Sequence, residues 1–522
     1  MSSEVVQTEQ RTANLDAIVR LGFAAYPNKF DTTHTVSALV DTYRDKTSEQ
    51  LETPRIETTT AGRVVGIRSF GKASFLVVSD GRTRLQVYVR QDALSPRDYE
   101  LSRLLDIGDQ IGVAGHLFRT KTNELSIWAS SLEFLAKCFL PLPEKWHGLQ
   151  DVEVRYRQRY LDLIVNPDVR KVFETRTHTV TAIRDYLIAA GFLEVETPMM
   201  QPIAGGALAR PFVTHHNALD MRLYLRIAPE LYLKRLTVGG IERVFEINRN
   251  FRNEGISTQH NPEFTMLEFY WAYVDYQRLM SFTEELLSSV AQRVVGATQF
   301  PFGDHTIDMS APFRRLSLRH AAAEAAGARL GTAVAVEDLR RIETVRPLAA
   351  QLGVDAPPSA GAGKIASNIF EALWEKELIQ PTFVHDFPTE VSPLSKQRPD
   401  DPDTVERFEL YIGGFEVANA FSELNDPVEQ RRRFEEQLAG RAAGDQEAHA
   451  MDEDYVRALE YGMPPAGGEG IGISGPFTSG TSHEFSSHAC SPVRLSRPQG
   501  AQGAPCLVAC LARFSVAAWP VG

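Results

Sequence analysis

The sequence predicts an α+β fold in which a small β-barrel precedes a larger mixed domain. Short alternating apolar runs fill the chain between about residues 62 and 135, and strand-like and helical stretches then alternate to about residue 473. The length of 522 residues and the hydrophobic content of 43% are those of a globular chain. A chain of this length forms about two to four domains.

The N-terminal part combines one short helix with five strands. An amphipathic helix is expected over residues 14–21, and the Tyr26-Pro27-Asn28 step ends it. The pair Asp80-Gly81 is a hairpin signal between the second and third strands, and a helical stretch at 99–105 precedes the fourth. This pattern indicates a barrel of the oligonucleotide-binding type, although other small β-barrels share it. The expected strands cover residues 63–67, 74–78, 85–89, 110–118 and 125–128.

Composition divides the chain into five parts. Leu140-Pro141-Leu142-Pro143 closes the barrel block and begins a linker, whereas the composition changes abruptly after Ile473. Three of the four cysteines follow Ile473, and Glu484 is the one acidic residue there, but the Cys and His spacing matches no compact zinc pattern. The parts are a helical N-terminal extension at 1–58, the barrel at 59–140, a linker at 141–170, the large domain at 171–473 and a tail at 474–522.

Charge is distributed unevenly along the chain. The net charge is −12, yet residues 61–140 contain 11 Lys/Arg against 8 Asp/Glu, which leaves this block at +3 and the remainder at −15. Local charge rather than net charge steers a ligand. A modestly basic module on an acidic body is therefore compatible with an RNA-binding protein that also has an ATP site.

The sequence favours a cytoplasmic protein with no membrane partner. Four cysteines are too few for a disulfide framework. The first 20 residues are polar and lack the apolar core of a signal peptide. No run of about 18 apolar residues is present to cross a membrane.

Two segments in the large domain have residues suited to a nucleotide. Phe251-Arg252-Asn253-Glu254 is followed by His260-Asn261-Pro262-Glu263-Phe264. Arginine matches the geometry of phosphate, and an aromatic ring can stack on a base. A surface loop with salt bridges would have the same spacing. Likewise, Gly205-Gly206 before Arg226–Glu230 could let the backbone approach a ligand, or could form a plain turn.

Four glutamates lie in strand-like, apolar surroundings. Carboxylates in such positions are rarely buried without partners. The partners could be a magnesium ion or the ammonium group of a substrate, and buried ion pairs with Arg or Lys are the alternative. The four are Glu268, Glu409, Glu416 and Glu423.

At these residues the chain resembles the class II aminoacyl-tRNA synthetases, and within them the bacterial lysyl-tRNA synthetases. The segment 244–255 is similar to motif 2, and Gly191–Pro198 is similar to motif 1. The chain also resembles the lysine enzymes in three further segments, which are residues 71–75, 147–151 and 419–426. The resemblance runs from about residue 11 to Ile473, and the aspartyl and asparaginyl enzymes lack this acid-rich pocket. It implies that the large domain is catalytic, with an antiparallel sheet flanked by helices.

The resemblance also implies roles for individual residues. Arg252 would be catalytic, holding the α-phosphate of ATP and the carboxylate of lysine. Phe264 would stack the adenine. A neutral amino acid would leave the pocket glutamates unpaired, which is unfavourable, so the pocket would reject it. The implied ATP site is Arg252, Glu254, His260, Asn261 and Phe264; the lysine site is Gly206, Glu230, Arg252, Glu268, Tyr270, Asn419, Phe421 and Glu423; and Glu409 and Glu416 would bind Mg²⁺.

The expected partners are a tRNA for lysine, ATP and L-lysine. In the barrel, Arg68, Phe75, Gln86 and Glu124 match positions that read the anticodon in the family, where unstacked bases meet aromatic and polar side chains. Phe75 alone could equally belong to the barrel core. The resemblance to motif 1 implies a homodimer.

The resemblance stops before the last catalytic motif is complete. Gly468–Ile473 matches the start of motif 3, but Ser474-Gly475 stands where the family has Asp-Arg. The motif 3 arginine and the final helix are absent, which indicates a frameshift or a wrongly joined end, with a genuine new tail as the alternative. We expect a lysine–tRNA ligase whose activity is in doubt. The alternatives are a non-catalytic tRNA- or nucleotide-binding paralogue, and a lysine ligase that modifies a protein, which the barrel argues against.

Overall fold

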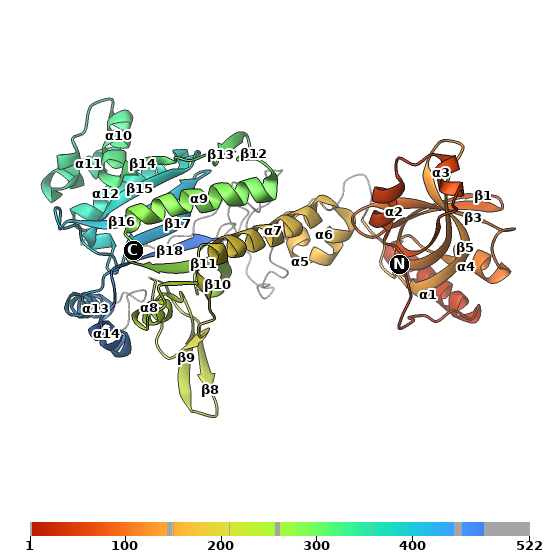
Figure 1. Cartoon of the computed structure of the whole chain (residues 1–522), viewed down its shortest axis with the longest axis horizontal. Helices are drawn as coiled ribbons and strands as arrows, with labels where there is room; N and C mark the ends of the chain where they lie inside the picture. Colours follow the sequence, from red (N-terminus) through yellow and green to blue (C-terminus); the bar gives the residue numbers. More distant parts are fainter. Residues whose placement is uncertain are drawn as a thin grey trace. The chain divides into compact units, whose positions relative to one another are not determined.

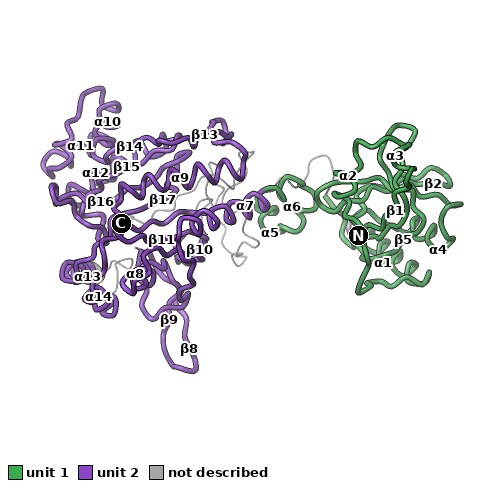
Figure 2. The backbone as a smooth tube through the Cα atoms, viewed as in Figure 1, with its two compact units in different colours: residues 1–171, 492–497 green, residues 172–491, 498–522 purple. Residues whose placement is uncertain are grey.

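The computed structural model describes residues 3–143, 149, 151–207, 209–255, 261–358, 360–442 and 451–473. The described chain forms two compact units that meet between Lys171 and Val172 (Figure 2). The expected tail at 474–522 and the predicted ATP-site residue His260 lie outside the described residues.

The first unit contains the predicted small β-barrel with four helices packed onto it. Its strands are β1 (Glu57–Phe70), β2 (Ala73–Ser79), β3 (Arg84–Arg90), β4 (Gln110–Arg119) and β5 (Leu125–Ala136). They follow the ring order β1-β2-β3-β5-β4, and the link between β3 and β5 is short and parallel, joining residues 86–88 to 126–128. Burial alternates along β2 and β3, so the period of two that predicted these strands is confirmed.

Of the four helices on the barrel, two are longer than the sequence pattern suggests and two were not expected. They are α1 (Ser3–Arg20), α2 (Val36–Tyr43), α3 (Ser48–Glu52) and α4 (Pro96–Leu104). The helix expected over 14–21 begins at Ser3, and its early part was missed because residues 5–10 are largely exposed and leave no apolar pattern. Ile18 and Leu39 are fully buried and join the core of the strands.

The segment expected as a linker contains two short helices, α5 (Val152–Arg157) and α6 (Arg159–Val165). They are held together by Asp162, which is fully buried and accepts hydrogen bonds from Arg155 (3.0 Å) and Arg159. The helices were missed because a polar pair rather than an apolar stripe joins them. The following helix, α7 (Asp168–Ala189), spans the boundary between the two units.

The second unit is built on an eight-stranded sheet (Figure 1). Its strand order is β14 (Arg314–Ser317), β15 (Thr382–Pro388), β16 (Thr404–Ile412), β17 (Phe415–Ser422), β18 (Ala466–Gly472), β11 (Glu263–Ala272), β10 (Arg243–Phe251) and β6 (Leu193–Glu194). All pairs are antiparallel except the two at the edges, β14–β15 and β10–β6. The antiparallel sheet flanked by helices is therefore confirmed.

One face of this sheet is apolar and the other carries polar side chains. Residues on the apolar face, such as Leu267, Leu410 and Ile471, are buried with α9 (Tyr276–Val295), which lies along this face in Figure 1. The polar face bears the motif residues. The two small sheets of the unit are β12 (Gln299–Phe302) with β13 (His305–Asp308), and β7 (Met200–Gln201), β9 (Met221–Leu225) and β8 (Val213–His216).

Helices surround the remaining edges of the sheet. A second core lies under α10 (Leu318–Leu330), α11 (Ile342–Leu352) and α12 (Ala362–Leu373), with the short turns η1 (Val336–Leu339), η2 (Glu375–Glu377) and η3 (Thr389–Val391). A third, smaller core joins α8 (Glu230–Val238), α13 (Pro427–Ala442) and α14 (Glu453–Glu460).

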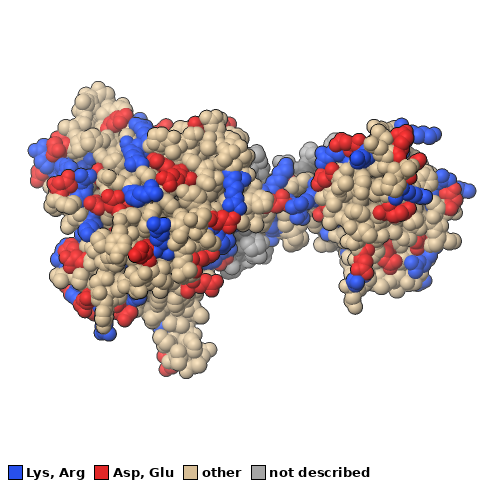
Figure 3. All heavy atoms as spheres, viewed as in Figure 1, with Lys and Arg blue, Asp and Glu red and all other residues tan. Residues whose placement is uncertain are grey.

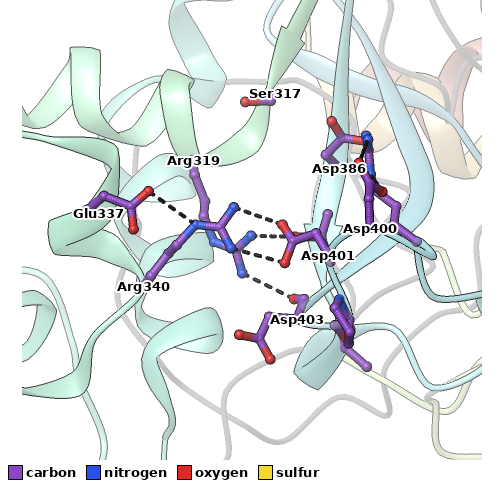
Figure 4. A network of polar contacts seen from close by, with 12 residues as sticks. Ser317, Arg319, Glu337, Arg340, Asp386, Asp400, Asp401 and Asp403 are labelled. Carbon is purple, nitrogen blue, oxygen red and sulfur yellow. Dashed lines mark hydrogen bonds and ion pairs between the residues drawn. The ribbon is translucent and has the colours of Figure 1, made fainter.

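A polar network ties α10 and Arg340, the residue directly after η1, to the connection between β15 and β16 (Figure 4). Arg340 forms an ion pair with Asp401 at 2.8 Å, and Arg319 donates to Thr404 Oγ1 at 2.6 Å and to the Asp403 carbonyl at 3.2 Å. The same connection pairs Ser395 with Glu423 in a β-bridge. The network therefore anchors the segment that is bridged to Glu423.

No described helix is long and apolar enough to cross a membrane. On the face drawn in Figure 3, positive and negative side chains are interspersed over both units.

Candidate active site

The candidate site lies on the polar face of the eight-stranded sheet. Strand register aligns one row across five strands, from Glu409 through Asn419, Gly470 and Glu268 to Glu246. The neighbouring row runs from Arg407 through Phe421 and Gly468 to Tyr270. Segments far apart in sequence therefore present their polar residues side by side.

A buried acidic cluster, called the acidic pocket below, forms where α8 lies next to the middle of β11 and the end of β17. Glu230, Glu268 and Glu423 are each at most 5% exposed. Lys234 Nζ lies 2.5 Å from Glu230 Oε1 and forms an ion pair with Glu423. The Tyr270 hydroxyl donates to Glu268 Oε1 at 2.7 Å. Lys234, which the sequence analysis did not single out, is thus part of the site.

Two glycines make room for this pocket. A Cβ on Gly468 would overlap the Glu423 carboxylate and the Tyr270 ring. Gly206 has a φ of +89°, a conformation that favours glycine, and a Cβ there would lie 2.9 Å from Glu230 Cβ. Gly206 and Glu230, which the resemblance assigns to the same end of the substrate, therefore lie side by side.

Electrostatics in the pocket follow from burial. Burial raises the pKa of Glu423 to about 8, although the Lys234 ammonium lowers it. Burial likewise raises the pKa of Glu268 well above its usual value, and the charge of Glu230 adds to this. Burial lowers the pKa of Lys234, but Glu230 and Glu423 outweigh it and keep that pKa well above normal. The carboxylates therefore need additional positive charge to be fully ionised.

Several buried polar atoms in this area have no hydrogen-bond partner among the described residues, including Asn419 Nδ2 and both carboxylate oxygens of Glu423, of which Oε2 is ion-paired with Lys234. Both side chains are nearly inaccessible, at 4% and 1% exposure. Buried polar atoms without partners are costly and are typical of ligand sites. Asn419 Oδ1 accepts a hydrogen bond from Arg407 at 3.3 Å, which fixes the amide orientation.

Arg252 lies on the same face, directly after β10. Burial lowers its pKa, while the charges of Glu254, Glu416 and Glu268 raise it. Its guanidinium carbon is 5.0 Å from the centre of the Phe264 ring, and its backbone N–H donates to the Pro262 carbonyl. The structure therefore brings the predicted ATP-site residues Arg252 and Phe264 together. Glu254 is exposed and Asn261 is half-buried, both near this turn.

Glu409 and Glu416 lie near each other beside Tyr411. Burial raises the pKa of Tyr411, and Glu409 and Glu416 raise it further. Glu409 accepts hydrogen bonds from Arg407 and Tyr411, both at 2.5 Å. The described residues contain no group of three potential metal ligands. Two carboxylates fit magnesium nonetheless, because this ion keeps several waters and shares the oxygens of substrate phosphates.

The predicted anticodon residues gather on the outer face of the first unit. Arg68 pairs with Phe75 across β1 and β2, and Phe75 stacks on Tyr88 with ring centres 4.8 Å apart. Gln86 on β3 donates to Ser126 on β5 at 3.0 Å. Glu124 is exposed just before β5. The aromatic row continues from Tyr88 to Trp128, at 5.0 Å, and this extension was missed by the sequence analysis.

Of three further site residues, only Lys234 could have been found from its spacing in the sequence. Lys234 stands four residues after Glu230 on one helix face, a spacing that brings opposite charges together. Arg226 and Glu246 form a fully buried ion pair at 2.7 Å that links β10 to the loop before α8. Their positions in separate segments left no signal in the sequence itself.

Comparisons with known proteins agree with this geometry. A family model described as tRNA synthetases class II (D, K and N) matches residues 151–475, and one described as an OB-fold nucleic acid binding domain matches residues 58–135. The sheet with its buried acidic pocket, preceded by the barrel, defines a class II tRNA synthetase.

Curated relatives show to which family within this class the chain belongs. Lysine–tRNA ligase of Carboxydothermus hydrogenoformans is 53% identical over 463 residues, which cover 89% of this chain and 92% of the relative. Lysine–tRNA ligase of Bacillus subtilis is 50% identical over 467 residues, covering 90% and 92%. The heat-inducible lysine–tRNA ligase of Escherichia coli is 50% identical over 468 residues, with the same shares. The chain belongs to the bacterial lysine–tRNA ligase family.

Proposed function

We propose that this chain activates L-lysine with ATP to form lysyl-adenylate and transfers the lysyl group to the 3′ end of its tRNA. The buried pocket of Glu230, Glu268 and Glu423 beside Arg252 is the observation that carries the proposal. The ε-ammonium group would lie against Glu268, Tyr270 and Glu423. The α-ammonium group would lie against Glu230 and the Gly206 backbone, with Asn419 and Phe421 completing the pocket.

Arg252 would perform the central positioning step. Its guanidinium would hold the lysine carboxylate against the α-phosphate, so that a carboxylate oxygen attacks phosphorus while the bond to pyrophosphate breaks. The substrate carboxylate is already ionised, so no general base is required. Positioning and charge neutralisation supply most of the catalysis in such a displacement. Magnesium bound with ATP would supply further positive charge, and Glu409 and Glu416 are the residues that would hold it.

The adenine would stack on Phe264, with Glu254 and Asn261 nearby. His260 is proposed for the same site on the resemblance alone, since it lies outside the described residues. The outer face of the barrel would read the lysine anticodon through Arg68, Phe75, Gln86 and Glu124. The aromatic row from Phe75 to Trp128 supports this, because stacking on aromatic rings is the usual way to hold single-stranded bases.

We further propose that the protein is a cytoplasmic homodimer. Apolar side chains around motif 1 support the dimer, because Ile188, Leu193 and Met200 are each more than half exposed on the second unit. Exposed apolar residues in one area are typical of an interface. We also propose, from the sequence, that the barrel domain covers residues 59–140 and that the catalytic domain covers residues 171–473.

Lysine-dependent exchange between ATP and pyrophosphate tests the proposed activity. Lysine should stimulate exchange and leucine should not, and Arg252→Ala should abolish the stimulation. Because motif 3 is altered in this chain, the same assay is run on a chimera with a family-type ending after Ile473. Absence of lysine-dependent exchange in the chimera, with lysine still bound, would favour the non-catalytic binding protein instead.

A further inference from the structure

The acidic pocket already contains one ammonium group, that of Lys234. This side chain is fully buried on α8, one turn after Glu230. Its Nζ lies 2.5 Å from Glu230 Oε1, contacts Glu423 Oε2, and is 5.9 Å and 5.4 Å from the ring centres of Tyr270 and Phe421. Glu230, Glu423 and Tyr270 are proposed to receive the ammonium groups of the substrate, and Phe421 is proposed to complete the same pocket.

We propose that Lys234 is a positioning residue for amino-acid recognition, an inference that rests on the proposed lysine pocket. It fixes the carboxylates of Glu230 and Glu423 and cancels one of the negative charges of the pocket, so that the remaining charge matches an amino acid with two ammonium groups.

The number of charges supports this role. Glu230, Glu268 and Glu423 supply three carboxylates, and Lys234 supplies one ammonium. The two remaining negative charges equal the two ammonium groups of lysine, whose own carboxylate is directed to Arg252. Without Lys234 the occupied pocket would keep an unpaired buried charge, which is strongly unfavourable.

The geometry indicates a permanent partner rather than a stand-in that leaves when lysine binds. Neither oxygen of Glu423 has a hydrogen-bond partner among the described residues, but Oε2 is ion-paired with Lys234, whereas Oε1 lies next to Gly468. One carboxylate oxygen is thus held by the protein and the other can take the substrate. The rings of Tyr270 and Phe421 add cation–π attraction that keeps the Lys234 ammonium in place.

Removing Lys234 should change how lysine binding depends on pH. The Lys234 ammonium lowers the pKa values of Glu230 and Glu423, which burial raises. Without it both carboxylates would hold their protons to higher pH, and a protonated carboxyl cannot pair with an ammonium group. The titratable and charged groups around Lys234 are Glu230, Glu268, Tyr270, Glu423 and Tyr455, with Arg235 and Glu246 further away.

Calorimetric titration of the full chain with L-lysine between pH 6 and 8.5 tests the proposal. Lys234→Met should bind lysine about tenfold or more weakly at pH 7 for each unit by which the carboxylate pKa rises, and should recover as pH increases. Arg235→Met is the matched control, because the adjacent Arg235 pairs with Asp452 and Asp454 outside the pocket. The control should keep the pH profile of the parent.

A purely structural role for Lys234 would weaken binding equally at every pH, and that result would overturn the proposal. If Lys234→Met does not fold, the double variant Lys234→Met/Glu423→Gln loses one charge of each sign, and it is compared with Glu423→Gln alone. By the same count of charges the double variant keeps two net negative charges and Glu423→Gln keeps one, so we expect the double variant to bind lysine at least as tightly as Glu423→Gln. A further loss of tenfold or more would contradict the pairing. Failure of the parent to bind lysine would instead refute the proposed function.

Discussion

Glu423 illustrates how one residue joins the framework of the protein to its substrate. Its side chain follows β17, is 1% exposed, and has Lys234 on one oxygen. Burial raises its pKa to about 8, so its ionised form depends on nearby cations. A neutral amino acid in this pocket would leave such a carboxyl either protonated or unpaired, which gives a physical basis for selecting lysine.

We expect Glu423→Gln to weaken lysine binding by about 2–4 kcal/mol, because one partner of a buried charge pair is lost. Calorimetry with free L-lysine measures this directly. Glu453→Gln is the control, since Glu453 pairs with Arg431 on the surface away from the pocket. Equal affinity of Glu423→Gln and the parent would mean that Glu423 does not contact the substrate.

Phe75 tests the outer face of the barrel. Phe75→Ala should weaken binding of an RNA hairpin with a lysine anticodon loop about 5- to 100-fold, as expected for loss of one base stack. Fluorescence anisotropy with the full chain measures this binding. The affinity for the RNA should fall as the salt concentration rises. Tyr26→Ala, which removes an exposed ring elsewhere in the unit, should have no effect. Equal affinity for unrelated anticodon loops would contradict specific reading.

At the scale of one strand, β18 carries an acid on the apolar side of the sheet. Glu469 is 2% exposed and accepts from the Thr283 hydroxyl at 2.7 Å. Burial raises its pKa to about 8, although the bond from Thr283 lowers it. The folded protein therefore holds this proton more tightly than the unfolded chain. The stabilisation is full below about pH 4.5 and is lost as pH rises toward 8.

Glu469→Gln should remove this dependence, because glutamine does not titrate in this range. The stability of the variant relative to the parent should increase between pH 5 and pH 8, by up to about 1.4 kcal/mol per pH unit. Thermal denaturation at both pH values provides the comparison. An unchanged difference at the two pH values would mean that Glu469 is ionised in the folded protein.

The elements differ in how far sequence predicted them. The strands of the barrel alternate in burial, and this pattern was visible in residues such as those of β2 and β3. The α5–α6 pair was missed because Asp162 joins it through buried polar bonds. Lys234 was missed although Glu230 lies four residues before it, because its second partner, Glu423, follows a distant strand and no local pattern records that pairing.

At the scale of the whole molecule, the altered ending should limit activity. Without the motif 3 arginine, we expect exchange activity about 10²- to 10³-fold below that of the chimera with a family-type ending, as for loss of one group that stabilises the transition state. The assay is lysine-dependent ATP–pyrophosphate exchange on equal amounts of soluble protein. Equal rates for the two proteins would show that the tail supplies a substitute cation.

Recognition of the ε-ammonium group by buried carboxylates is the central claim, and a comparison of L-lysine with L-norleucine tests it most directly. Norleucine has the same carbon chain but no ε-amino group. Calorimetry on the full chain should show saturable binding of lysine and binding of norleucine at least about 100-fold weaker, because norleucine leaves buried polar groups unpaired. Binding of norleucine as tightly as lysine would contradict the account.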